Sequence, residues 1–138
     1  MNLVEALLQA DEKKVTALQT EDIEIKRLSK LLGEPFIITV SQVSNQRLTE
    51  IYNSATTIKR HGKTDTDGYQ ANLLVMVEGI KTKFNDPELL KKYGCVTVKE
   101  LYGKLFNFGE VGMIVKKIVA LSGVGDEDQQ EELEEVKN

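Results

Sequence analysis

Residues 78–123 read EGIKTKFNDPELLKKYGCVTVKELYGKLFNFGEVGMIVKKIVALSG, and their start and stop signals predict three consecutive helices. Asp86 is suited to cap the first of them. Pro87 follows at the first helical position, where a missing backbone N–H costs nothing. Gly94 is suited to the left-handed turn that often ends a helix. A short helix is therefore expected from Pro87 to just before Gly94.

The two helices that follow begin with capping patterns. Thr97 and Glu100 form a T-x-x-E pattern, and Asn107 and Glu110 form an N-x-x-E pattern; both satisfy backbone N–H groups that a helix start leaves unpaired. Gly123 is placed to end the third helix. Apolar side chains at helical spacing predict the buried faces, which are Val98, Leu101, Tyr102 and Leu105 on the second helix and Val111, Ile114, Ile118 and Leu121 on the third.

Upstream of this region, an alternating pattern predicts two strands. Ile23 and Ile25 flank a charged residue, and Phe36, Ile38 and Val40 alternate with polar residues. Apolar and β-branched side chains in alternation are typical of half-buried strands. The two strands are expected to pair as an antiparallel ribbon, with a helix covering its apolar face.

Further helices are expected at residues 3–10, 44–60 and 68–83, with Ser44 as the cap of the second and a polar loop at 61–67. The apolar centre of the 68–83 segment favours a buried core helix, and a buried strand is the alternative. The predicted fold class is α+β, mostly α-helical, with five or six helices and a small two-stranded antiparallel β-ribbon near residues 22–41.

Composition limits the class of protein. With 138 residues, 41% of them hydrophobic, the chain is long enough for one globular domain, expected at residues 1–124. A net charge of −4 argues against a nucleic-acid binder. One cysteine excludes a disulfide framework and fits an intracellular compartment. No apolar run reaches the ~18 residues of a membrane span, so no membrane partner is expected.

The acidity is concentrated at the C-terminal end. Residues 126–138 hold seven acids and one lysine, about −6, whereas the rest holds 15 acids and 17 bases, about +2. We expect residues 125–138 to form an acidic, disordered tail that keeps the chain soluble. Leu133 and Val136 are three positions apart, so a partner that binds the tail would contact both.

Residues suited to covalent chemistry are sparse. A Cys95 thiolate would need a base, and the sole histidine, His61, lies in another segment, so Cys95 is interpreted as a small core residue. Asp65-x-Asp67-Gly68 has the spacing of part of a calcium loop but lacks its flanking acids, so these carboxylates are interpreted as caps. The sequence predicts no catalytic residue, no cofactor, no metal and no enzyme activity.

Binding is the remaining class of function, and Phe106 and Phe108 are the candidates for it. They flank Asn107, and one of them is expected to pack against the helix it precedes. The other is either buried as well or exposed and able to contact a partner. A different class of function is a small adaptor or regulatory domain that binds nucleic acid through Lys59, Arg60 and Lys63. A third class is a subunit of an enzyme that is catalytically silent here and is completed by another chain.

The helix punctuation also carries a resemblance. VEGIK, ND-PELLKKYG, T-KELYGKLFNFGEV and ALSG, between residues 77 and 123, resemble the C-terminal half of the small tail assembly chaperones of tailed phages and prophages. The most similar type is that of defective prophages in Gram-positive bacteria. LLQAD near Ala6 and EIKRLSKLLGEPF at residues 24–36 extend the resemblance over most of the chain.

The resemblance implies a function and a set of partners. Such a chaperone binds the long helical tape measure protein, keeps it soluble and helps tail-tube subunits polymerise around it. It acts in the host bacterial cytoplasm and is absent from the mature virion. An apolar groove, expected on the last three helices, would hold the partner helix. The tail-tube protein is a further partner, and an exposed apolar groove would also favour a homo-oligomer.

Overall fold

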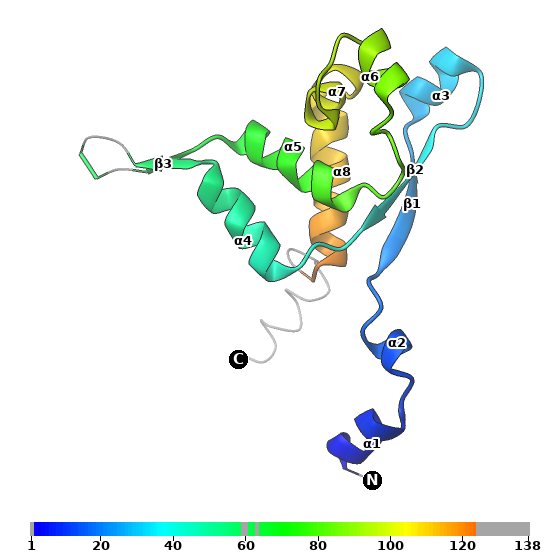
Figure 1. The fold of residues 1–138 in the computed structure, drawn as a ribbon, viewed down its shortest axis with the longest axis vertical. Helices are drawn as coiled ribbons and strands as arrows, with labels where there is room; N and C mark the ends of the chain where they lie inside the picture. The colour runs from blue at the N-terminus through cyan, green and yellow to red at the C-terminus, as the bar shows by residue number, and fades with distance from the viewer. Residues whose placement is uncertain (1, 59–60, 63, 124–138) are drawn as a thin grey trace, which may run out of the picture.

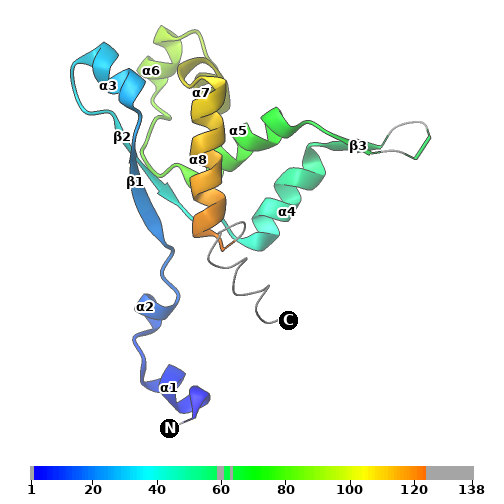
Figure 2. The same cartoon turned by 180° about the vertical axis from the view of Figure 1, so that it is seen from behind.

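Helix α8 (Phe108–Leu121) is central to the fold and packs against helix α5 (Gly68–Gly79) and strand β2 (Ile37–Ser41) (Figures 1 and 2). The structure is a computed structural model and describes residues 2–58, 61–62 and 64–123. The predicted inner face of α8 is confirmed, with Leu121 half-buried and Val115 as an additional member. The buried side chains of α8 are Val111, Ile114, Val115 and Ile118.

Helix α5 confirms the core helix and excludes the buried strand. Asp67 caps it by accepting a hydrogen bond from the Gln70 N–H at 3.0 Å. The helix ends at Gly79 instead of the expected residue 83, because the chain then runs alongside β2. Ile80 bridges to Val40, and the Lys81 N–H donates to the Thr39 carbonyl at 2.8 Å. Pairing with the edge of β2 that β1 leaves free therefore ends the helix at Gly79.

The predicted β-ribbon is confirmed. Strand β1 (Thr20–Glu24) pairs antiparallel with β2, with Ile23 opposite Ile38. The segment that joins them holds a helix that the sequence analysis did not predict, α3 (Lys26–Leu32). Gly33 ends α3 with a φ of 71°, a conformation that favours glycine. Ile25, Ile38 and Val40 lie in the main core.

The helix expected at 44–60 is shorter than predicted. Helix α4 (Asn45–Ser54) begins at the Ser44 cap as expected, but strand β3 (Thr56–Ile58) follows it and pairs with β4 (Thr64–Thr66). The threonine hydroxyls of Thr56 and Thr66 are 2.7 Å apart. The β-branched run therefore forms a hairpin, and the prediction of a helix to 60 and a loop at 61–67 was wrong.

The capping signals of the last region are confirmed. Helices α6 (Pro87–Lys92) and α7 (Val98–Leu105) begin where Asp86 and Thr97 accept hydrogen bonds from backbone N–H groups at 3.0 and 3.2 Å. Asn107 and Glu110 form a complete capping box at the start of α8. The Glu100 carboxylate accepts from the N–H of Val96 at 3.3 Å and from the hydroxyl of the cap residue Thr97 at 3.4 Å.

The N-terminal segment extends away from the rest of the molecule (Figures 1 and 2). It holds α1 (Leu3–Gln9), as predicted, and the short α2 (Glu12–Val15). The described residues form eight helices and two two-stranded sheets, so the α+β, mostly helical class is confirmed and α2 and α3 account for the extra helices. The division into a domain at 1–124 and a tail at 125–138 stays a prediction, since residues 124–138 lie outside the described part.

Gly79, at the end of α5, packs tightly against Ile118 of α8. A Cβ added there would lie 2.5 Å from Cδ1 and 2.9 Å from two further carbons of the buried Ile118 side chain. We expect Gly79→Ala to destabilise the fold by about 1–3 kcal/mol through overpacking. At Gly112, on the exposed side of α8, an added Cβ meets open space. The control Gly112→Ala should therefore stabilise by about 0.5–1 kcal/mol. Urea unfolding measures both, and equal effects would contradict the close crossing.

Candidate partner-binding groove

An apolar groove lies between helices α3, α6 and α7. Its volume is about 170 Å³, and Leu32 and Tyr93 at its rim are 60% and 41% exposed. An apolar cavity of about 150 Å³ is enough to hold a benzene molecule, so the groove has room for one apolar side chain of a partner. We call this the apolar groove; its lining is Leu28, Leu32, Phe36, Phe84, Leu89, Tyr93, Leu101 and Leu105.

Helices α6 and α7 form one wall of the groove and are fastened to each other. Leu90, Cys95 and Leu101 make a small separate core between them. The ammonium of Lys104 donates to the backbone carbonyl of Tyr93 at 2.9 Å, just where α6 ends. A cation at this end of a helix is favourable because the last carbonyls are unpaired. Cys95 thus has the packing role that its sequence context predicted.

Helix α3 forms the opposite wall, and an arginine fixes its position. The Arg27 guanidinium donates to both carboxylate oxygens of Glu110, at 3.0 and 2.8 Å, and to the Leu105 carbonyl at 2.8 Å. Glu110 also accepts from the N–H of Asn107 at 2.9 Å, within the capping box. One side chain of α3 therefore binds both the end of α7 and the start of α8. We call these contacts the Arg27 clamp.

The clamp shifts the titration of both partners. The hydrogen bond from Arg27 holds the pKa of Glu110 below its ordinary value, although partial burial opposes this. The Glu110 side chain is only 13% exposed. The same hydrogen bond raises the pKa of Arg27. The charged form of Glu110 is thus the form that the fold stabilises.

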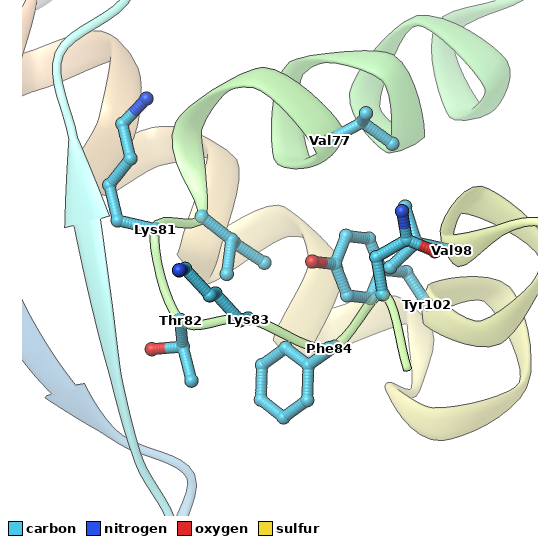
Figure 3. A pocket seen from close by; sticks show the side chains of 9 residues that line it. Val77, Lys81, Thr82, Lys83, Phe84, Val98 and Tyr102 are labelled. Carbon is cyan, nitrogen blue, oxygen red and sulfur yellow. The ribbon is translucent and has the colours of Figure 1, made fainter. Parts of the chain in front are cut away.

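Aromatic rings lie behind the groove. Phe36 and Phe84, which line it, stack with ring centres 5.9 Å apart, and Phe106 and Tyr102 pack edge-on against them. Tyr102 also borders a neighbouring pocket of about 430 Å³, where its ring lies between Val77 and Phe84 (Figure 3). Burial raises the pKa of Tyr102 to about 12, so its phenol stays neutral. Two lysines and a threonine give this second pocket a mixed, less apolar lining.

The structure separates the two phenylalanines that the sequence suggested. Phe106 is 3% exposed and belongs to the main core together with Val111, as the residue before the cap packs in a hydrophobic staple. Phe108 is 80% exposed and stacks on Tyr69 with ring centres 6.3 Å apart. Leu133 and Val136, and the cationic residues Lys59, Arg60 and Lys63, lie outside the described residues.

The sequence analysis fixed no residue of a groove, and whether the apolar groove binds a partner stays a prediction. It expected a groove on the last three helices, and α6 and α7 do line it, but the third wall is α3 and not α8. Leu28 and Leu32 are four positions apart on α3, a spacing that places them on one helix face. That spacing was the signal in the sequence for a helix at residues 26–32. It was missed because the segment KRLSKLL is short.

Neither a metal cluster nor a membrane-spanning helix is present in the described part of the chain. Among residues 2–58, 61–62 and 64–123, no group of three or more His, Cys, Asp or Glu side chains is placed to hold a metal ion. In the same ranges, no helix has the length and apolarity needed to cross a bilayer.

The comparisons with known proteins agree with the helix pattern. Residues 4–137 match the family model described as Phage XkdN-like tail assembly chaperone protein, TAC. The chain belongs to this family. The fold of this tail assembly chaperone is similar to the crystal structure of the protein yqbn, with a TM-score of 0.54 and 18% identity over 83% of this chain and 97% of that one. No curated protein sequence matches it significantly.

The Arg27 clamp makes the stability of the chaperone depend on pH. The folded-state pKa of Glu110 is depressed, so its contribution is complete above about pH 4.3, the ordinary glutamate value, and is lost as pH falls through the folded pKa. We expect Glu110→Gln to lower the free energy of unfolding at pH 7. The difference in unfolding free energy between this variant and wild type should become smaller toward pH 3, where Glu110 of wild type is increasingly protonated. The control is Glu88→Gln, in the first turn of α6. A gap that does not change with pH would contradict the clamp.

The different positions of the two phenylalanines predict different costs. Phe106→Ala should destabilise the chaperone by about 3–5 kcal/mol, because it leaves a cavity in the core. Phe108→Ala should cost about 1 kcal/mol or less, since it removes only the stacking on Tyr69. Thermal or urea unfolding measures both. Equal costs would show that Phe108 is buried in solution.

Proposed function

We propose that this tail assembly chaperone binds the tape measure protein through the apolar groove, keeps it soluble and promotes assembly of the tail tube around it. The family membership supports a role in tail assembly. The observation that supports a binding site for an apolar partner is the groove itself. It is an apolar space with exposed rim residues on the body of the molecule. A long helical protein with apolar stripes would aggregate alone, and such a groove can cover part of a stripe.

The size of the groove favours weak, reversible binding. Burying one Leu or Phe side chain contributes about 1.5–3 kcal/mol, which is less than the usual free-energy cost of associating two molecules. Tight coverage of a long partner therefore needs many copies of the chaperone bound side by side. Each copy could leave as a tube subunit replaces it. Such reversible binding would account for the proposed absence of the chaperone from the mature virion.

The charges around the groove suggest the chemistry of the bound helix. The helices α3, α6 and α7 together hold seven bases and two acids, a net charge of about +5. A partner helix with an apolar stripe flanked by acidic residues would complement this surface. We propose that Phe108 is a second, peripheral contact, and that the chaperone acts in the host cytoplasm by binding alone, without catalysis.

Two neighbouring leucines of α3 provide the test. Leu32 lines the groove, whereas Leu31 is also solvent-exposed but lies outside it. We expect Leu32→Asp to abolish solubilisation of the co-expressed tape measure protein, because a carboxylate would be buried in an apolar site. The matched control Leu31→Asp should retain it. The soluble fraction of the tape measure protein after co-expression is the measurement, with purified fragments giving the affinity.

The affinity should fall at least about tenfold for Leu32→Asp, the equivalent of ~1.4 kcal/mol. Phe108→Ala measured in the same assay tests the peripheral contact. If Leu32→Asp solubilises the tape measure protein as well as Leu31→Asp does, the groove is not the binding site. If the wild-type chain gives no solubilisation at all, the proposed partner is wrong.

A further inference from the structure

The N-terminal arm, residues 2–18, presents an apolar helix face that the described part of its own chain leaves uncovered. Leu3 and Leu7 form one i, i+4 pair on α1, and Val4 and Leu8 form the adjacent pair. All four are more than half exposed, with Leu8 at 80%. Val15 and Leu18 farther along the arm are exposed too. A row of apolar side chains on a folded helix marks a contact surface.

The arm is directed away from the groove of its own chain. Gln19 is tied to Gln42 by two hydrogen bonds of 2.9 Å, one between backbone groups and one to the Gln42 side chain. This pairing extends the β-ribbon and fixes the direction in which the arm leaves it. The arm and the groove consequently lie at opposite ends of the molecule (Figures 1 and 2).

The arm and the groove are both apolar, and their surroundings carry opposite charge. The groove accepts one apolar side chain and is surrounded by helices with a net charge of about +5. Residues 2–12 of the arm carry three acids, Glu5, Asp11 and Glu12, and no base, whereas Lys13 and Lys14 follow them and leave the whole arm at about −1. Glu5 lies in the first turn of α1, and Asp11 and Glu12 follow the end of that helix. The acidic segment 126–138 is the rival occupant, but it has only Leu133 and Val136 to fill an apolar site.

We propose that α1 of one copy of this chain docks in the apolar groove of a second copy, with Leu8 or a neighbouring leucine as the inserted side chain. The arm then connects protomers, and the groove is covered while no other partner is present. This inference does not depend on the identity of the tape measure protein as partner. It concerns the chaperone alone and is tested alone.

Self-association of the full-length chain is the first measurement, by light scattering and sedimentation over a range of concentrations. We expect wild type to form a dimer or a larger assembly, because an arm and a groove at opposite ends of one chain can link successive copies. Leu8→Asp on the arm and Leu32→Asp in the groove should each raise the dissociation constant of the assembly at least about tenfold. The matched controls are Gln9→Asp on α1 and Leu31→Asp on α3, which carry the same charge change beside these positions and should associate as wild type does.

Mixing the variants separates a contact from a general loss of structure. A Leu8→Asp chain retains its groove and a Leu32→Asp chain retains its arm, so an equimolar mixture should recover association that neither shows alone. Circular dichroism should show that both variants are folded. A mixture that stays monomeric, or equal association in Leu8→Asp and Gln9→Asp, would overturn the proposal.

Cross-linking identifies the groove directly. Chains with Leu8→Cys mixed with chains with Leu32→Cys should give disulfide-linked dimers under mild oxidation, and chains with Leu8→Cys mixed with Leu31→Cys should give far fewer. The wild-type chain, whose Cys95 is buried, is the background control. A chain carrying both cysteines that links only within itself would show the arm on its own groove and overturn the proposal. Association that persists without residues 2–12 but disappears without residues 126–138 would assign the contact to the acidic segment instead.

Discussion

The close crossing of α5 and α8 at Gly79 is the constraint on which the rest of the structure depends. Ile118 occupies the space that a side chain at Gly79 would need, so the two helices pack with almost no gap. Because α5 ends at this point, the chain is delivered to β2, where Ile80 pairs with Val40. The direction of residues 80–86 then sets where α6 and α7 begin. The missing side chain at Gly79 thereby permits both the tight packing of α5 on α8 and the pairing of the next residue with the β-ribbon.

The groove follows from a second, longer connection. Arg27 and Glu110 are 83 positions apart in sequence, yet their ion pair positions α3 across from α7. Arg27 is 41% exposed, so the pair is better understood as a positional restraint than as a main source of stability. It acts at the base of the groove, on the Leu105 carbonyl, while Lys104 restrains α6 from the other side. The rim residues Leu32 and Tyr93 are left in contact with solvent.

The sequence specified local features far better than the surfaces they build. Helix starts at Ser44, Asp86, Thr97 and Asn107 were predicted correctly, because a cap involves residues only two or three positions apart. The end of α4 was missed because its β-branched residues form strand β3 only once β4 is available to pair with it. The groove could not be assembled from sequence, since its walls come from segments more than fifty positions apart. Phe106 and Phe108 differ only in which side of the cap they occupy, and packing decided which was buried.

Under the proposed function the apolar groove releases its partner, and it then has to remain soluble when empty. A deeper groove would bind a tape measure helix more tightly, but it would also expose more apolar surface between binding events. The arm proposed above would resolve this conflict, because a second copy would cover the groove with a contact of similar strength and similar charge. Tape measure binding would then be an exchange of one apolar helix for another, and its apparent affinity would fall with chaperone self-association. Under that arrangement a variant lacking the arm contact would bind the tape measure protein more tightly, and the variant alone would aggregate more readily. Simple loss of a binding surface cannot produce both effects.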